Sequence, residues 1–433
     1  MSLRYFGTDG IRGKAFDSPL TTSEVARWGK SWSQAALNHK VQTLVLGHDP
    51  RLSSEPLLKA FISVMDPSIS LIYLGMVPTP VLAYETSRTS GAWGVMFSAS
   101  HNPPLDNGIK GFSSSGEKLE EAVEMEIETI FDSTPVADKI VNPNLPAIQP
   151  HQYLNVHEPF PVPVPWRIAI DCAHGAASTL AQNIFLGQNI HWIGTPSDGA
   201  RINHFVGCTH LETLQKVILE SNLDFGFAFD GDADRCLFVD SKGDVFDGDQ
   251  ILWLLVKEGI RAGRPPEGVV GTVMTNGALE HLILDAGIPF LRTPVGDKFI
   301  LRAMATCNYP IGAEASGHVI QKSLGPTGDG LATALSVCRI LKDVGIREVF
   351  ESRFKPFSHQ LVSFATRLKK PIDMCPSLNE VLDNLPKEFP SLRTVIRWSG
   401  TENKLRLMAE APDLHSVNIA LERLQHAALR DLN

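Results

Sequence analysis

The chain has 433 residues, which is enough for about three or four domains of ordinary size. Hydrophobic residues make up 43% of it and charged residues 20%, a composition typical of globular proteins with apolar cores. The formal net charge is −9. Proteins that bind nucleic acid usually carry a basic excess that neutralises the phosphate backbone, so this charge disfavours a nucleic-acid-binding function.

Targeting and redox features indicate a cytoplasmic protein. The first residues, MSLRYFGTDGIRG, carry charges and glycines where a signal peptide has its apolar stretch. The apolar run at 251–256 is far shorter than the roughly 20 helical residues needed to cross a bilayer. The six cysteines show no CxxC spacing, and in a chain of this length we expect buried thiols rather than a disulfide framework.

Short β-branched runs, each followed by a polar turn and then an amphipathic stretch, recur along the chain. They lie at 43–49, 93–100, 167–177, 225–235 and 269–283. Strands that alternate with helices predict βαβ units and mostly parallel sheets. Ligands bind such sheets beyond the carboxyl ends of the strands, where the polar residues of these runs fall. Ordinary turns are the alternative for any single run.

The C-terminal part of the chain has a different pattern. Two predicted strands, at 394–399 and 404–411, are joined by a tight turn. The stretch 413–430 that follows has apolar residues on one helical face, and Asp413 is placed to cap it. This pattern predicts a small α+β module.

Proline-rich stretches indicate where the predicted units meet. Two of them, at 142–150 and 159–166, flank a first linker, and 264–268 predicts a loop in or before a third unit. The segment at 355–360 predicts a further boundary. The chain is therefore expected to divide into residues 1–150, 151–250, 251–357 and 358–433.

Three aspartates at alternating positions follow a predicted strand in FDGDADR: Asp230, Asp232 and Asp234. Carboxylates this close repel one another unless a cation lies between them, and hard oxygen ligands suit Mg²⁺. A calcium-binding EF-hand loop begins with the same spacing, but it needs Gly and Glu where this chain has Arg235 and Ser241. The alternative is a solvated acidic turn, and the tight strand-end context favours a magnesium site.

Ser100 follows another predicted strand, in SASHNPPLDNGIKGF (98–112). A serine on a rigid strand-end loop is a candidate nucleophile, and His101 or Lys110 could accept its proton or supply positive charge. The alternatives are a hydrogen-bonded turn serine and a Ser-His-Asp hydrolase. The chain contains no G-x-S-x-G elbow, which disfavours the hydrolase. The GKS at 29–31 is not a P-loop because position 24 is Glu.

A candidate phosphate site lies in RWSGTENKLR (397–406). Hydroxyls, backbone N–H groups and cations converge there on one Gly-containing turn, which can form an anion nest. Each charge-assisted hydrogen bond contributes roughly 1.5–3 kcal/mol. A solvated hairpin tip is the alternative. The candidate residues are Arg397, Ser399, Gly400, Thr401, Lys404 and Arg406.

Two neighbouring segments could contact a sugar. In GAEASGH (312–318), Glu314, Ser316 and His318 alternate with small residues, and polar side chains at this spacing can hydrogen-bond sugar hydroxyls. Lys298, in VGDKFIL, offers a positive charge for a phosphate or a proton.

The serine, aspartate, GAEASGH and RWSGTENKLR segments, in this order along the chain, resemble those of the α-D-phosphohexomutase family over nearly the whole chain. The combination is far more specific than any one motif. The segments FGTDGIRG (6–13), INHFVGCTHLETL (202–214) and VGDK (295–298) are most similar to the branch of the family that acts on glucosamine phosphates.

The resemblance implies a role for each candidate residue. Ser100 corresponds to the serine that carries the phosphoryl group, and it is expected to be a further ligand of the Mg²⁺ held by Asp230, Asp232 and Asp234. Glu314 and Ser316 correspond to the sugar-reading loop. The residues expected beside the reacting groups are Arg12, His101, Lys110, Arg235, Lys298 and His318. The residues expected to hold the non-reacting phosphate are Arg397, Ser399, Gly400, Thr401 and Arg406.

The fold implied is three similar mixed-sheet α/β domains and a smaller C-terminal α+β domain around a central cleft. The implied activity is that of an isomerase that converts glucosamine 6-phosphate reversibly to glucosamine 1-phosphate, a precursor for UDP-N-acetylglucosamine synthesis. The reaction passes through a phosphoserine enzyme and a sugar 1,6-bisphosphate. The residue that accepts the hydroxyl proton stays open among Lys110, His101, Lys298 and His318.

Three other functions compete with this expectation. The first is an enzyme of the same family that acts on mannose or glucose phosphates. The second is a non-catalytic phosphosugar-binding protein, and the third is a phosphosugar hydrolase. In each case the expected partner is a small phosphosugar, and neither nucleic acid nor a membrane is expected to bind. One assembly to consider is a homodimer.

Overall fold

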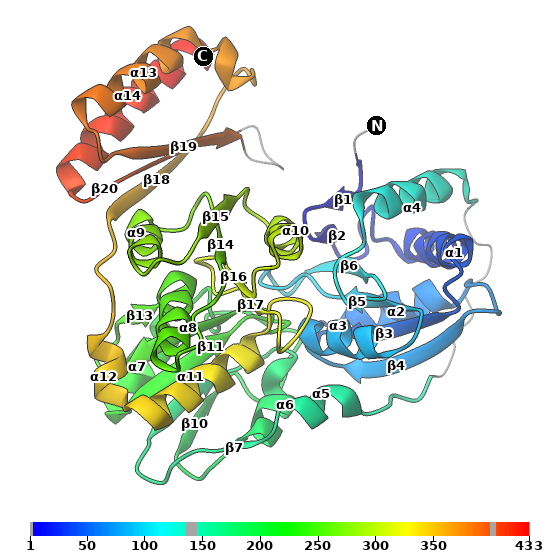
Figure 1. Cartoon of the computed structure of the whole chain (residues 1–433). Helices are drawn as coiled ribbons and strands as arrows, with labels where there is room; N and C mark the ends of the chain where they lie inside the picture. Colours follow the sequence, from blue (N-terminus) through cyan, green and yellow to red (C-terminus); the bar gives the residue numbers. More distant parts are fainter. Residues whose placement is uncertain (1–2, 136–144, 399–403, 433) are drawn as a thin grey trace.

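A computed structural model of the chain describes residues 3–135, 145–398 and 404–432. Its strands form three mixed sheets, a three-stranded antiparallel sheet and one short two-stranded pair (Figure 1). The expected fold, three mixed-sheet α/β units followed by a smaller α+β unit, is confirmed. Among the described residues, none of the helices has the length and apolarity that a membrane crossing requires.

The first sheet has six strands in the order β1-β2-β6-β5-β3-β4. The pairs of β3 with β4 and β5 are parallel, whereas β6 is antiparallel to both β5 and β2. The strands are β1 (Phe6–Gly7), β2 (Gly10–Lys14), β3 (Thr43–His48), β4 (Ser70–Met76), β5 (Ala92–Phe97) and β6 (Asp106–Phe112). The helices are α1 (Thr22–Asn38), α2 (Ser54–Ile62), α3 (Thr79–Arg88) and α4 (Glu121–Ser133).

The second sheet has the order β10-β8-β11-β12-β13, and β7 pairs with β9 beside it. Its strands are β7 (Phe160–Pro161), β8 (Ile168–Asp171), β9 (Phe185–Leu186), β10 (Ile190–Ile193), β11 (Phe225–Phe229), β12 (Cys236–Asp240) and β13 (Val245–Phe246). The helices of this region are α5 (His151–Val156), α6 (Ala177–Ile184) and α7 (Glu212–Ser221).

The third sheet has four strands in the order β15-β14-β16-β17. The strands are β14 (Val269–Thr272), β15 (Phe290–Thr293), β16 (Ile311–Ala313) and β17 (Val319–Gln321). The helices are α8 (Gly248–Arg261), α9 (Gly277–Asp285), α10 (Asp297–Cys307), α11 (Gly330–Val344) and α12 (Ile346–Glu351). Asp247, Asn276 and Asp329 cap α8, α9 and α11 by accepting hydrogen bonds from the first-turn backbone.

The C-terminal unit pairs its strands in the order β18-β20-β19, all antiparallel. Asp413 caps its last helix, as the sequence pattern predicted, because its carboxylate accepts a 2.9 Å hydrogen bond from the Ser416 N–H. The elements are β18 (Ser358–Ala365), the 3₁₀ helix η1 (Ile372–Met374), α13 (Pro376–Glu388), β19 (Arg393–Trp398), β20 (Lys404–Ala411) and α14 (Leu414–Leu432).

Each of the three mixed sheets contains an antiparallel hairpin that carries one of the predicted functional loops. The hairpins are β5–β6, β11–β12 and β16–β17. The expectation of mostly parallel sheets is therefore wrong at the runs 93–100 and 225–235, which are followed by an antiparallel strand rather than a helix. A short loop can join antiparallel strands, whereas a parallel crossover needs a dozen or more residues.

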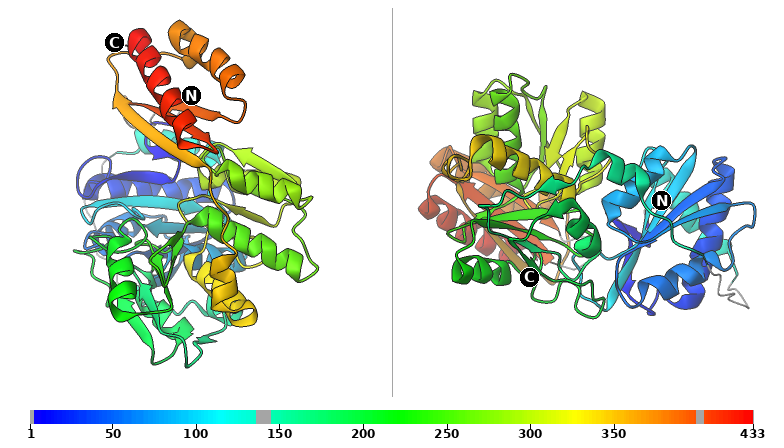
Figure 2. Two further views of the ribbon diagram at one scale, coloured as in Figure 1. Left: turned by 90° about the vertical axis from the view of Figure 1, so that its left-hand side faces the viewer. Right: turned by 90° about the horizontal axis from the view of Figure 1, so that it is seen from below.

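The apolar cores show how the units are joined. One cluster of buried side chains runs through all three α/β units and includes Leu82, Phe227, Leu279 and Leu335. The C-terminal unit has a separate core, between its sheet and its two helices, and it lies above the other units in Figure 1 and in the left view of Figure 2. Five of the six cysteines are buried, as expected, but Cys307 at the end of α10 is exposed.

Candidate active site

Ser100 lies in the loop between β5 and β6, and its side chain is buried. Its backbone φ is +51°, in the left-handed region that residues other than glycine seldom adopt. The Ser100 N–H donates a 2.9 Å hydrogen bond to the Ser98 hydroxyl. A buried polar loop that holds a residue in such a conformation is a feature of functional sites.

The aspartate loop between β11 and β12 faces this serine. The Ser100 hydroxyl donates a 2.6 Å hydrogen bond to Oδ2 of Asp230. One carboxylate oxygen from each of Asp230, Asp232 and Asp234 lies within 4.8 Å of the others, and all three residues are buried. Two hairpins from different sheets therefore bring the predicted nucleophile and the predicted metal ligands into one site.

The aspartate cluster has the properties of a site for a divalent cation. Burial, together with repulsion from Asp234 and Asp232, raises the pKa of Asp230 well above its ordinary value. Oδ1 of Asp232 and Oδ1 of Asp234 are buried and have no hydrogen-bond partner among the described residues. Hard carboxylate oxygens at this spacing that accept no hydrogen bond fit Mg²⁺.

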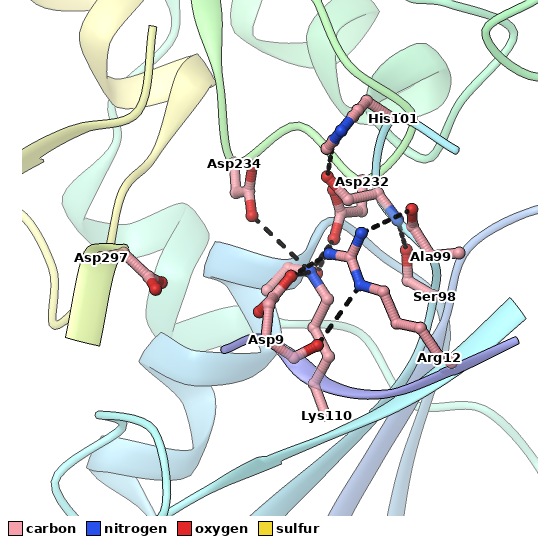
Figure 3. A network of polar contacts seen from close by, with 12 residues as sticks. Asp9, Arg12, Ser98, Ala99, His101, Lys110, Asp232, Asp234 and Asp297 are labelled. Carbon is pink, nitrogen blue, oxygen red and sulfur yellow. Dashed lines mark hydrogen bonds and ion pairs between the residues drawn. The ribbon is translucent and has the colours of Figure 1, made fainter. Parts of the chain in front are cut away.

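Lys110 brings positive charge to the same place from β6 (Figure 3). Its Nζ lies 2.8 Å from Asp232, 3.0 Å from Asp9 and 3.7 Å from Asp234. Although burial opposes it, attraction to Asp232 and Asp9 raises the pKa of Lys110 above its ordinary value, so the ammonium is charged at neutral pH. Arg12 forms an ion pair with Asp9, which places its guanidinium beside Lys110.

His101 is uncharged in this environment. Its Nδ1 lies 3.3 Å from the Ser100 hydroxyl. Burial and the positive charges of Arg235 and Arg12 lower the pKa of His101 to about 4. Arg235 itself lies 3.8 Å from Asp234. His101 therefore presents a neutral imidazole, able to accept a proton, next to the predicted nucleophile.

His318, in contrast to His101, is positively charged in its surroundings. Its ring nitrogens lie 3.7 Å from Asp234 and 3.7 Å from Asp297. Although burial opposes it, these two carboxylates raise the pKa of His318 to about 9. The imidazole is therefore protonated at neutral pH, and it can donate a proton or neutralise negative charge.

A closed ring of alternating charges joins the three α/β units at this site. Lys118 completes it, because its Nζ lies 2.5 Å from Asp9 and 2.6 Å from Asp297. The sequence analysis did not predict Asp9, Lys118 or Asp297 as site residues. Asp9 and Asp297 lie inside motifs but were not singled out, and nothing in the sequence marked Lys118. The ring runs through Asp234, Lys110, Asp9, Lys118, Asp297 and His318.

The predicted sugar-reading segment forms the β16–β17 turn. The Glu314 carboxylate accepts a 2.9 Å hydrogen bond from the Gly296 N–H, which ties this turn to the start of α10. Ser316 is exposed at the tip. Lys298 lies on α10 with its ammonium 5.5 Å from the Phe299 ring, outside the ring of charges. This turn therefore offers polar groups to a ligand.

Arg397 and Arg406 face each other across β19 and β20. Burial and the charge of Arg406 lower the pKa of Arg397, and its Nε is buried with no hydrogen-bond partner among the described residues. Two cations paired in this way favour an anion between them. The other predicted members of this phosphate site, Ser399, Gly400 and Thr401, lie outside the described residues.

Arg393, on the same strand as Arg397, links the C-terminal unit to the third unit. Its Nε donates a 2.9 Å hydrogen bond to Glu410, and its Nη2 donates one of 2.9 Å to the Thr275 carbonyl. Glu410 in turn accepts a 2.9 Å hydrogen bond from the Gly277 N–H at the start of α9. Sequence reasoning missed this contact because it joins segments that are distant in the chain.

The domain families that match the chain are four parts of one protein family. They are described as phosphoglucomutase/phosphomannomutase α/β/α domains I, II and III and the C-terminal domain, and they match residues 3–137, 162–243, 247–357 and 384–424. The chain belongs to the phosphoglucomutase/phosphomannomutase family. It is an α-D-phosphohexomutase and therefore an isomerase, so the resemblance seen in the sequence is confirmed.

Individual relatives of this phosphohexomutase agree with the assignment. The phosphoglucosamine mutase of Deinococcus radiodurans is 34% identical over 97% of both chains. A solved phosphoglucomutase/phosphomannomutase family protein from Burkholderia thailandensis superposes with a TM-score of 0.80 at 21% identity, covering 100% of this chain and 99% of its own. The Aspergillus fumigatus N-acetylphosphoglucosamine mutase, solved with GlcNAc-6P and magnesium, superposes with a TM-score of 0.67 at 18% identity, covering 100% and 96%. At these identities the solved structures show a shared fold.

Proposed function

We propose that this phosphohexomutase is a phosphoglucosamine mutase that converts glucosamine 6-phosphate reversibly to glucosamine 1-phosphate. The observation that carries the proposal is the Ser100 hydroxyl, 2.6 Å from Asp230 in the buried aspartate cluster. The name of the 34% identical relative supports the choice of sugar. Ser100, once phosphorylated, is the phosphoryl donor in this reaction.

The proposed reaction has two transfers. In the first, the free sugar hydroxyl attacks the phosphorus of phosphorylated Ser100, the bond from phosphorus to the serine oxygen breaks, and a sugar 1,6-bisphosphate forms. The bisphosphate then turns around in the cleft. In the second transfer, the Ser100 oxygen attacks the phosphorus of the other phosphoryl group and the bond from that phosphorus to the sugar oxygen breaks. The sugar oxygen takes up a proton, the phosphoserine is restored, and the monophosphate product is released. Alignment and charge neutralisation supply most of the catalysis in such transfers.

The three aspartates of the cluster, whose carboxylate oxygens suit Mg²⁺, would hold this ion. When bound, the ion neutralises charge on the phosphoryl oxygens. Asp230, Asp232 and Asp234 are its proposed ligands, with an oxygen of the phosphoserine as another. The magnesium complex of the Aspergillus relative supports this choice of metal.

The charged residues around the cluster have distinct proposed roles. Lys110 and Arg12, both cationic, neutralise the transferring phosphoryl group, and Arg235 lies near the other carboxylate oxygen of Asp234. Protonated His318 can return a proton to the leaving oxygen, whereas neutral His101 can accept one. These charge states favour His101 over Lys110 and His318 as the proton acceptor.

We also propose the arrangement of the rest of the molecule. Glu314 and Ser316 contact sugar hydroxyls, with Lys298 nearby, and the Arg397–Arg406 pair holds the phosphate that does not react. The proposed domains are residues 1–150, 151–250, 251–357 and 358–433, one for each of the four larger sheets; α8 begins at Gly248, three residues before the proposed start of the third domain. The proposed location is the cytoplasm, and a homodimer is the proposed assembly.

The choice of sugar can be tested by comparing initial rates with three substrates. Glucosamine 6-phosphate is expected to give a kcat/KM at least about tenfold above glucose 6-phosphate and mannose 6-phosphate, a preference of about 1.4 kcal/mol in the transition state. Each assay contains Mg²⁺ and a catalytic amount of sugar 1,6-bisphosphate. Faster turnover of the mannose or glucose compound would replace the proposed substrate, and steady release of inorganic phosphate would indicate a hydrolase instead.

The phosphate site can be tested with Arg406→Gln. Losing one charge-assisted hydrogen bond of roughly 1.5–3 kcal/mol is expected to lower kcat/KM by about 10- to 100-fold. The measurement is the steady-state rate with glucosamine 6-phosphate. Lys387→Gln, which removes an exposed charge from α13 in the same unit, is the matched control and should change kcat/KM less than about twofold. Equal effects of both variants would place the phosphate elsewhere.

A further inference from the structure

The backbone of the Ser100 loop is held from behind by two side chains that belong to neither the metal cluster nor the ring of charges. They are Arg51, from the loop after β3, and Asn203, from the segment before α7 in the second unit. Both donate hydrogen bonds to the same two carbonyl groups, those of Ser100 and Asn102.

Arg51 is buried and uses all its nitrogen atoms on this loop and its support. Nη2 donates to the Ser100 carbonyl at 2.9 Å and to the Asn102 carbonyl at 2.8 Å, while Nη1 donates to the Asp106 carbonyl at 2.9 Å. Nε donates to Asp49 at 2.8 Å. The rigid fork of a guanidinium thus fixes both ends of the loop relative to β3.

Asp49 extends the same support to the other side of Ser100. Its carboxylate accepts a 2.8 Å hydrogen bond from the Ser98 hydroxyl, and the Ser98 hydroxyl accepts the one from the Ser100 N–H. The N–H and the carbonyl of Ser100 are therefore both connected to the Asp49–Arg51 ion pair, which has no exposed surface.

Asn203 reaches the loop from the second unit. Its Nδ2 donates to the Ser100 carbonyl at 2.8 Å and to the Asn102 carbonyl at 3.1 Å. The metal loop packs against the same atoms, because a Cβ on Gly231 would lie 2.7 Å from the Ser100 carbonyl oxygen and 2.9 Å from Asn203 Nδ2. Asn203 therefore lies where the serine loop and the aspartate loop meet.

We propose that Arg51 and Asn203 are positioning residues that form a clamp on the phosphoserine loop and orient the Ser100 oxygen toward the aspartates. The proposal rests on the proposed role of Ser100 in phosphoryl transfer. Ser100 has a positive φ, and a strained residue keeps its conformation only where its surroundings over-determine it. The loop must keep one geometry while its serine gains and loses a phosphoryl group twice in each cycle.

Asn203 allows a test that leaves the fold intact. Its φ is +60°, so Asn203→Gly accepts the backbone conformation while deleting the amide, and Asn203→Asp keeps the shape but removes the donor. Both variants are expected to lower kcat by about 10- to 100-fold, because a displacement of about 1 Å can cost 10²-fold. KM should stay within about threefold, since the clamp touches no substrate. The substrate is whichever sugar phosphate the wild type turns over fastest.

The matched control is Asn222→Gly, which deletes another asparagine of positive φ, at the end of α7 and away from the site. Hydrogen exchange provides a second readout that does not need activity: amides of residues 98–106 should exchange faster in Asn203→Gly than in wild type or Asn222→Gly. If exchange in this loop is unchanged, or if kcat stays within about twofold of the control, the clamp is refuted. If no sugar phosphate is turned over, the proposed function fails while the exchange experiment still decides the clamp.

Discussion

Ser100→Ala is expected to abolish the mutase reaction. Removing the oxygen that carries the phosphoryl group should lower kcat by about 10⁴-fold or more, as loss of a nucleophile does in other covalent enzymes. The fold should survive, because the variant deletes one buried hydroxyl whose hydrogen bonds go to Asp230 and His101 within the site. The measurement is the conversion of glucosamine 6-phosphate with Mg²⁺ and sugar bisphosphate present.

Phosphorylation of the protein gives an independent readout of the same variant. Incubation with the sugar 1,6-bisphosphate should add one phosphoryl group to the wild type, visible by intact mass, and none to Ser100→Ala. Ser115→Ala, on the exposed turn after β6, is the control and should behave as wild type. A Ser100→Ala protein that keeps more than about one hundredth of the wild-type kcat would require another nucleophile.

Removal of divalent cations is expected to have the next largest effect. EDTA should lower the rate by about 10²- to 10⁴-fold, because the ion supplies several kcal/mol of charge stabilisation, and added Mg²⁺ should restore it. Mg²⁺ should also raise the unfolding midpoint of the resting protein, since it binds the folded cluster only. That shift should grow as the pH rises from acid, because Mg²⁺ displaces the proton that the raised pKa of Asp230 retains.

Two variants distinguish loss of the metal site from the nonspecific effect of removing a carboxylate. Asp230→Asn should stay folded without metal, because it removes one of three mutually repelling carboxylates, and it should reduce the midpoint shift that Mg²⁺ causes. Asp285→Asn, at the exposed end of α9, should keep the full shift. An unchanged rate after thorough chelation, with no midpoint shift on adding Mg²⁺, would contradict a metal-dependent reaction.

The sequence by itself was sufficient to predict local structure and local chemical motifs in this protein. The runs at 43–49 and 167–177 each begin with a strand, as predicted, and Asp413 caps the last helix, because period, composition and capping act over a few residues. The spacing of Asp230, Asp232 and Asp234 indicated a cation for a similar reason: nearby carboxylates repel one another in any fold. The order of four such motifs was specific enough to indicate the family.

Only the tertiary structure decided how these parts meet. The antiparallel β5–β6 and β11–β12 hairpins depend on sheet partners, so a local pattern could not distinguish them from parallel units. Lys118 carries no motif, and its place between Asp9 and Asp297 exists only once the first and third units are packed together.

The charge states of the site likewise come from three-dimensional surroundings. His101 and His318 are the same residue type with the same intrinsic pKa. Burial and neighbouring cations nevertheless lower the pKa of His101, whereas neighbouring carboxylates raise that of His318 against the effect of burial. The support of Ser100 by Arg51 and Asn203 is invisible in the sequence for the same reason. The sequence determined which chemical groups are available, whereas burial and long-range contacts decided which of them share a site and which carry charge.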